Sequence, residues 1–347
     1  MPNVDILIER ARIVRAIRAF FDARGFVEVE TAVRIPAPAP EEHIDCPPCR
    51  DGGYLRASPE LQMKKLLAAG MDRLYQIGPC FREGERGSRH NPEFTMIEWY
   101  RKNATYLDIA ADLEALLGDL GLGQSAASAG ACPQNSGVCP HAHAGVCPPA
   151  RGVCPQRLTV RDAYLKYAGW DPWTDWNQDR FDFDMATKIE PTIKALGGGV
   201  FLMDYPPQAA SLAKLSKISD FQSISEDAFG GLSPQERGLS PAISGGLSPR
   251  ERGLSPGVCA ERWEFYWDGM ELANCFTELC DAAEQRARFV AAKANRKVLG
   301  ESDYPLDEDF LATLPRIGSA AGVALGVDRL VMVLTGAKEI SAVRAPV

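Results

Sequence analysis

Two glutamates flank an Asp-Gly pair in a segment rich in aromatic residues. Asp-Gly at 268–269 predicts a β-hairpin with a two-residue turn. In that register Tyr266 faces Glu271 and Glu264 lies diagonal to Glu271, so both carboxylates share one face. Like charges on one face are unfavourable unless a cation neutralises them, so the pair predicts a divalent-metal site. The alternative is that one glutamate pairs with an arginine such as Arg262.

Two arginines match these carboxylates. Arg82 lies in a charged, glycine-containing turn, and Arg329 lies where a glycine-bearing apolar strand is expected to run into a helix. A planar guanidinium meets phosphate oxygens with two hydrogen bonds, and arginine combined with magnesium is a common way to hold a polyphosphate. The four side chains therefore predict a polyphosphate site.

Regular elements must position these residues. Apolar residues at helical spacing predict an amphipathic helix over 6–21, and alternation predicts a short strand over 26–31. The Pro-rich passage that follows, through Pro48, is expected to be irregular. Ser58-Pro59-Glu60 is expected to open a helix, with Ser58 as its cap. Further expected elements are an antiparallel hairpin of 74–81 with 93–100, a helix over 281–299, and a strand-to-helix junction within 322–330.

Two low-complexity stretches interrupt this pattern. Gly-Val-Cys-Pro recurs within 123–156, and Gly-Leu-Ser-Pro recurs within 225–259. Such short, Pro- and Gly-rich units bury little, so we expect solvated insertions without chemistry. Half of the ten cysteines lie in these stretches. A lone Cys-Pro-Pro-Cys at 46–49 lacks the second pair of a structural zinc site, and we interpret it as two reduced thiols in a loop.

Composition excludes several classes of protein. The chain has 347 residues, 46% hydrophobic and 24% charged, which is typical of a globular protein rather than a fibre or a disordered chain. The net charge of -8 gives no general affinity for nucleic-acid phosphates. No apolar run approaches the ~18 residues that cross a bilayer, and the charged N-terminus is unlike a signal peptide, so we expect a cytoplasmic protein without membrane contact.

Longer motifs resemble a known family. Phe-Arg-Glu at 81–83 followed by Arg-His-Asn-Pro-Glu-Phe-Thr-Met-Ile-Glu-Trp-Tyr at 89–100 resembles motif 2 of class II aminoacyl-tRNA synthetases of the lysyl type. Residues 322–333 resemble motif 3, 28–31 the end of motif 1, and 271–279 the lysine-pocket signature. The resemblance implies an α+β fold with a mostly antiparallel sheet flanked by helices, as one catalytic domain over 1–347 that forms a homodimer.

The resemblance also implies a nucleotide site. By that match Arg82 contacts the α-phosphate and Arg329 the γ-phosphate of ATP, while Phe94 and Arg329 enclose the adenine. Glu264 and Glu271 would hold Mg2+, as the hairpin argument also predicts. The remaining ATP-binding residues implied by the match are Glu83, Gly84, Asn91, Phe265 and Gly326.

An amino-acid pocket follows from the same resemblance. Ser58 and Glu60 would hold the substrate amino group, and Glu278 would be the main specificity residue. A buried carboxylate that is left without an ammonium partner weakens the binding of uncharged analogues by a free energy on the order of several kcal/mol. The other implied pocket residues are Tyr100, Glu271, Asn274 and Ala324.

Within this family the chain most resembles the stand-alone paralogues that attach lysine to elongation factor P. About twenty-five residues precede motif 1, where lysyl-tRNA synthetases carry an anticodon-binding barrel. Ala324 stands where synthetases usually have Gly, which is typical of these paralogues and of their preference for β-lysine. Three residues depart from the family pattern. Gly84 occupies the third place of Arg-x-Glu, Ala32 replaces the Pro of motif 1, and Cys275 replaces a Gly, which predicts a narrower pocket.

The expected reaction is ATP-dependent activation of lysine or β-lysine as an aminoacyl-adenylate, followed by transfer to a lysine side chain of elongation factor P. Position and charge neutralisation, rather than a side-chain nucleophile, would drive it. Two alternatives stay open: a regulatory pseudo-synthetase without catalysis, and a lysyl ligase that acts on tRNA or a small molecule. The acidic composition and the absent barrel disfavour tRNA.

Overall fold

The structure is a computed structural model that describes residues 3–122, 155–217 and 257–345. Within these ranges a large sheet has the order β1-β4-β5-β11-β10-β9-β7-β6, and β8 pairs with β9. Most neighbours are antiparallel, and only β1–β4 and β6–β7 are parallel. The strands are β1 Val27–Glu28, β2 Arg34–Ile35, β3 Tyr54–Leu55, β4 Arg73–Phe81, β5 Glu93–Lys102, β6 Gln156–Thr159, β7 Gly199–Tyr205, β8 Leu215–Lys217, β9 Val258–Trp267, β10 Met270–Thr277 and β11 Ala320–Gly326.

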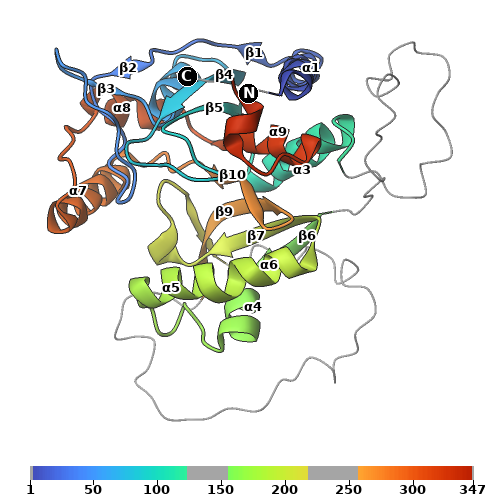
Figure 1. Cartoon of the computed structure of the whole chain (residues 1–347). Helices are drawn as coiled ribbons and strands as arrows, with labels where there is room; N and C mark the ends of the chain where they lie inside the picture. Colours follow the sequence, from blue (N-terminus) through green and yellow to red (C-terminus); the bar gives the residue numbers. More distant parts are fainter. Residues whose placement is uncertain (1–2, 123–154, 218–256, 346–347) are drawn as a thin grey trace.

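Helices cover both faces of this sheet (Figure 1). The helices α1, α3 and α9 pack together on one face, whereas α2 and α8 pack with part of α7 on the other. A smaller group formed by α4–α6 packs against β6 and β7. Their bounds are α1 Val4–Asp22, α2 Glu60–Ala68, α3 Tyr106–Asp119, α4 Val160–Ala163, α5 Gln178–Asp184, α6 Glu190–Leu196, α7 Ala282–Leu299, α8 Glu308–Thr313 and α9 Val327–Thr335.

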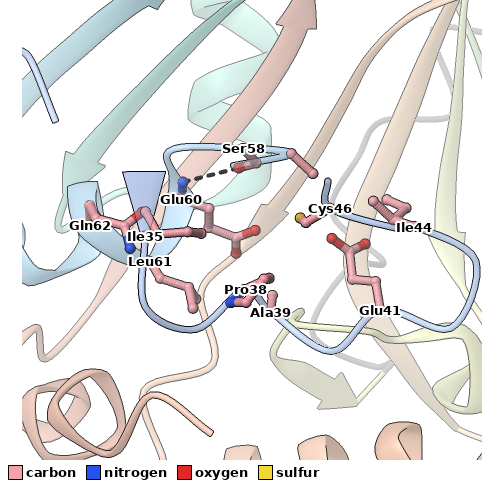
Figure 2. Close-up of a pocket in the computed structure, with 11 residues that line it drawn as sticks. Ile35, Pro38, Ala39, Glu41, Ile44, Cys46, Ser58, Glu60, Leu61 and Gln62 are labelled. Carbon is pink, nitrogen blue, oxygen red and sulfur yellow. Dashed lines mark hydrogen bonds between the residues drawn. The ribbon is translucent and has the colours of Figure 1, made fainter. Parts of the chain in front are cut away.

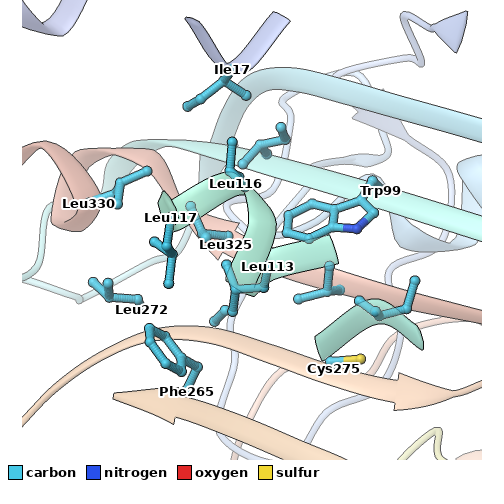
Figure 3. Close-up of a cluster of buried hydrophobic side chains, with 14 of the residues drawn as sticks. Ile17, Trp99, Leu113, Leu116, Leu117, Phe265, Leu272, Cys275, Leu325 and Leu330 are labelled. Atoms are coloured by element: carbon cyan, nitrogen blue, oxygen red, sulfur yellow. The ribbon is translucent and has the colours of Figure 1, made fainter. Parts of the chain in front are cut away.

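The main hydrophobic core lies between the sheet and α1, α3 and α9 (Figure 3). The expected first helix is confirmed, because Ile13, Ile17, Phe20 and Phe21 of α1 are buried at helical spacing. Its start is fixed by Asn3, whose side chain accepts hydrogen bonds from two backbone amides of the first turn. This core covers one face of the sheet, whereas the opposite face carries two smaller hydrophobic clusters.

The predicted hairpins are confirmed. Strands β4 and β5 pair antiparallel from Arg73 with Arg101 to Phe81 with Glu93. Strands β9 and β10 are joined by Asp268 and Gly269, both with positive φ, +47° and +74°, as a tight two-residue turn requires.

Several predicted boundaries need correction. The Pro-rich passage contains a short strand, β2, which pairs with β3. Helix α2 begins at Glu60 with Pro59 at its cap position, although the Ser58 hydroxyl still accepts a hydrogen bond from the Glu60 amide at 3.0 Å. The two expected insertions lie mostly outside the described residues. Their predicted ends do not, since Gln156 lies in β6, and Cys259 is a buried residue of β9. Among the described residues, no helix is both long and apolar enough to cross a bilayer.

Candidate active site

The polar face of the sheet collects the predicted site residues. Side chains alternate between faces along a strand, so core residues such as Cys275 and Leu325 leave their neighbours facing the opposite side. In the register of β5, β11 and β10, Ala324 lies between Glu98 and Asn274, and Gly322 pairs with Tyr100. Sequence positions far apart thereby become adjacent on one surface.

The hairpin of β9 and β10 holds the two predicted metal carboxylates. Tyr266 pairs with Glu271, as predicted, but a bulge between Glu271 and Ala273 places Asn274, rather than Ala273, opposite Glu264. Burial, followed by the charge of Glu264, raises the pKa of Glu271, which shows that the two carboxylates influence one another.

Both carboxylates also have arginine partners, which was the alternative interpretation. Arg262 forms an ion pair of 2.5 Å with Glu264 and donates a hydrogen bond of 3.2 Å to Asn274 Oδ1. The Tyr266 hydroxyl donates to the other oxygen of Glu264 at 2.7 Å. Glu271, on the neighbouring strand β10, has its carboxylate 3.5 Å from Nη1 of Arg329 in α9.

Arg329 and Arg82 lie beside this hairpin. Arg329 donates to the Glu271 carbonyl at 3.0 Å, and its other terminal nitrogen lies 2.7 Å from His90 Nε2. Burial and the Arg329 charge lower the pKa of His90, so the neutral ring can accept that hydrogen bond. The guanidinium of Arg82 lies 5.1 Å from the centre of the Phe94 ring.

Arg82 retains an unused donor. Its Nη1 lies 3.5 Å from Glu85, while its Nε is buried and has no hydrogen-bond partner within the described parts of the chain. Gly84 stands at the third place of Arg-x-Glu, and the carboxylate that pairs with Arg82 is that of the next residue, Glu85. A buried donor without a partner is costly and is typical of a group that receives a ligand.

Most of the other predicted nucleotide residues lie near Arg82 or Arg329, and one is buried in the core. Glu83 and Gly84 are exposed in the β4–β5 turn, and the Asn91 side chain donates to the Glu93 carbonyl at 2.7 Å. Gly326 ends β11 and caps α9, next to Arg329. The prediction for Phe265 is wrong as a side-chain contact, because its ring is fully buried in the core, 4.7 Å from that of Phe201.

A cluster of buried acids forms the predicted amino-acid pocket. Ser58 donates to one oxygen of Glu98 at 2.6 Å, and the Tyr100 hydroxyl donates to the other at 2.8 Å. Burial, with the Glu60 charge next, raises the pKa of Glu98 to about 7. Burial likewise raises the pKa of Glu278 to about 8.

Glu278 has a protein partner that the sequence did not reveal. Lys64 of α2 forms ion pairs with both Glu60 and Glu278, and its side chain is 1% exposed. Its ammonium lies 5.0 Å from the centre of the Phe276 ring. The sequence carried a signal for the Lys64–Glu60 pair alone, since these two residues are four apart on one helix.

Of two small residues near the pocket, Gly322 shapes it and Cys275 does not. A Cβ added to Gly322 would lie 2.1 Å from the Tyr100 ring, so only glycine fits there. Cys275, expected to narrow the pocket, points instead into the hydrophobic core, and the expectation of a narrower pocket is wrong for that reason.

A small cavity lies beside Glu60 (Figure 2). Glu41 and Glu60 point toward each other across it, and burial together with the Glu60 charge raises the pKa of Glu41. Its volume of about 20 Å³ suits one group of the size of a water or an ammonium. Sequence analysis missed Glu41, because it lies in the Pro-rich segment where no periodicity marks a side chain.

Arg296 of α7 fixes the segment that carries Glu41. This arginine is 1% exposed and donates to the carbonyls of Glu41 and Ile44 and to the Asp45 carboxylate. Its guanidinium also stacks 4.4 Å from the centre of the Tyr304 ring. Residues 41–45 are therefore held by a buried cation rather than by regular structure.

Comparisons with known proteins give matches over nearly the whole chain. The family model of class II tRNA synthetases (D, K and N) matches residues 3–345. A protein of Proteus mirabilis is 32% identical over 99% of this chain and 96% of its own length. A protein of Vibrio cholerae is 33% identical over 99% and 96%, and one of Photorhabdus laumondii is 32% identical over 98% and 94%. Each of the three is named elongation factor P–(R)-β-lysine ligase.

Proposed function

Because the chain belongs to the family of class II tRNA synthetases (D, K and N), we propose that it is an ATP-dependent ligase that attaches a lysine isomer to a lysine side chain of elongation factor P. The names of relatives that match nearly the whole chain support this acceptor, and they favour (R)-β-lysine as the amino acid. The observation that carries the proposal is a β9–β10 hairpin whose Glu264 and Glu271 lie close to Arg329 of α9 and within reach of the Arg82 charge, beside a buried acidic pocket.

ATP is proposed to bind over the β9–β10 hairpin. Arg82, with its unused Nε donor, is assigned to the α-phosphate, and Arg329 to the γ-phosphate. Phe94 lies under the Arg82 guanidinium, and it is assigned to stack with the adenine together with Arg329. Glu83, Gly84, Asn91 and Gly326 complete the assigned site.

Glu264 and Glu271 fit a magnesium ion that is shared with phosphates. Within the described residues, no group of three or more His, Cys, Asp or Glu could hold a metal alone. Magnesium usually binds through one or two carboxylates plus substrate phosphates and water, so a pair is sufficient. When bound, the ion would offset the charge of the polyphosphate, and it would take Glu264 from Arg262 and Glu271 from Arg329.

The acidic pocket is proposed to take a diamino acid. Glu60 and Ser58 are assigned to the amino group near the reacting carboxylate, whereas Glu278 and Tyr100 are assigned to the distal amino group. Asn274 and Ala324 pair with each other on the sheet and are assigned to line the pocket. A site that has buried carboxylates disfavours an analogue without ammonium groups, because the carboxylates would stay unpaired.

The proposed reaction has two steps. A carboxylate oxygen of the amino acid attacks the α-phosphorus of ATP in line, the bond to the β-phosphate bridging oxygen breaks, and pyrophosphate leaves. The amine of the acceptor lysine then attacks the acyl carbon, the bond to AMP breaks, and the amine loses a proton as the amide forms. Arg82 stabilises charge on the α-phosphate, and the pocket holds the reactants in line.

Two assays test this proposal. Exchange of labelled pyrophosphate into ATP should depend on (R)-β-lysine or lysine and should be lost in Arg329→Ala. Incubation with elongation factor P should add the mass of one lysyl group to the factor. Absence of exchange with every lysine isomer would favour a regulatory pseudo-synthetase, and charged tRNA beside an unmodified factor would assign a different acceptor.

We propose that the protein is a homodimer, which light scattering of the purified protein would test. We also propose a cytoplasmic location, together with a single catalytic domain over residues 1–347 that carries two low-complexity insertions. Limited proteolysis should cut first within these insertions.

A further inference from the structure

Lys64 is the cation at the centre of the acidic pocket. It belongs to α2, is 1% exposed, and pairs with Glu60 on its own helix and with Glu278, which follows β10. The aromatic face of Phe276 covers the same ammonium. Burying an ammonium is unfavourable unless carboxylates and hydrogen bonds compensate for the lost water.

Its partners indicate more than a role in stability. One carboxylate would neutralise a buried lysine, yet Lys64 bridges two, and both are assigned to the amino groups of the substrate. A third carboxylate, Glu98, is held by the hydroxyls of Ser58 and Tyr100 rather than by a cation. Glu41 is a fourth carboxylate, across the small cavity from Glu60, so the carboxylates outnumber the one buried ammonium and can bind the ammonium groups of a lysine isomer.

We infer that Lys64 is a positioning residue for the substrate, because it holds Glu60 and Glu278 in place. The pocket around it keeps a net negative charge, which binds the ammonium groups of the substrate. The inference rests on the proposed function and deepens it. Lys64 itself does not touch the reacting atoms. It acts through Glu60 and Glu278, and it prevents their mutual repulsion from separating them before the substrate arrives.

The pH dependence of binding follows from the same contacts. The groups that face Lys64 or its partners are Glu60 on α2, Glu41 in the segment between β2 and β3, Glu98 and Tyr100 on β5, and Glu278 after β10. Burial raises the pKa of Glu278 to about 8, while Lys64 opposes that rise. Protonation of this carboxyl removes charge that a substrate ammonium requires, so lysine binding should weaken as the pH falls below about 8. Without Lys64, the weakening should begin at a higher pH.

The test compares Lys64→Met with Lys65→Met. The second variant removes the adjacent lysine, which pairs with Asp307 outside the pocket and is 29% exposed. Lysine-dependent pyrophosphate exchange is measured from pH 6 to 9.5, with separate KM values for amino acid and ATP. Lys64→Met should raise the KM for lysine about 10- to 100-fold at pH 7, as expected for lost charge-assisted hydrogen bonds, and leave the KM for ATP within about twofold. Lys65→Met should match the wild type.

The outcomes separate the inference from the proposed function. The inference is overturned if Lys64→Met has the KM and pH profile of Lys65→Met, or if its KM values for lysine and ATP rise in parallel, as in a merely loosened fold. If Lys64→Met does not fold, Lys64→Gln, which keeps hydrogen-bond donors without charge, should show the same displacement of the pH profile. No exchange by the wild type would overturn the proposed function and the inference together.

Discussion

Arg296→Lys tests how the pocket loop is held. The arginine donates four hydrogen bonds, to the carbonyls of Glu41, Ile44 and Ser302 and to the carboxylate of Asp45, and it is almost completely buried. A lysine ammonium at the end of a linear chain cannot reproduce this planar fork. Two or three of the four bonds should be lost. At about 1 kcal/mol for each net hydrogen bond, we expect a loss of about 2–3 kcal/mol in the free energy of unfolding.

Arg286→Lys is the matched control. It is the same substitution on the same helix, but Arg286 makes an exposed pair with Glu308. Unfolding in urea should separate the two variants, because only Arg296→Lys loses buried contacts. Hydrogen exchange should also increase at residues 41–46 in Arg296→Lys alone. Equal stabilities for the two variants would refute the conclusion that Arg296 orders this segment.

Three further predictions concern the pocket. Gly322→Ala should raise the KM for lysine and destabilise the protein by about 1–3 kcal/mol, because the added methyl overlaps the Tyr100 ring; unchanged kinetics and stability would contradict this. Glu41→Gln should raise the KM for the amino acid about 10-fold through loss of a charged contact, whereas Glu42→Gln, which alters a side chain turned toward α7, should not; equal effects in pyrophosphate exchange would exclude a role for the cavity. Glu98 has a folded-state pKa near 7, above its usual 4.5, so the folded protein binds more protons than the unfolded chain between these values and should lose stability as pH rises through them. Denaturation midpoints should show this decrease in the wild type and less of it in Glu98→Gln, and equal slopes would contradict it.

Local patterns were sufficient for the elements that frame the site. The turn residues 268–269 predicted the β9–β10 hairpin, and apolar spacing predicted α1, because both signals act over a few residues. The bulge after Glu271 was not predictable in this way. It depends on how β10 fits β11 as well as β9, and it determines that Asn274 rather than Ala273 faces Glu264.

The contents of the pocket depended on long-range packing. The resemblance to synthetases identified Glu60 and Glu278 as pocket candidates, but not the lysine that joins them, since Glu278 reaches Lys64 only after the sheet has formed. Phe265 was misjudged for a simpler reason, because alternation along β9 already turns its side chain away from the face that carries Glu264. Cys275 was misjudged because the bulge between Glu271 and Ala273 reverses the alternation along β10 and turns Cys275 into the core.

Arg82, Arg329, Glu264 and Glu271 are proposed to act together on one triphosphate. A crystal structure of the protein with Mg2+ and a non-hydrolysable ATP analogue tests this proposal. We expect both guanidiniums to contact phosphate oxygens and the two carboxylates to bind a metal that is shared with the phosphates. A nucleotide bound elsewhere, or bound here with these glutamates still paired to Arg262 and Arg329, would contradict it.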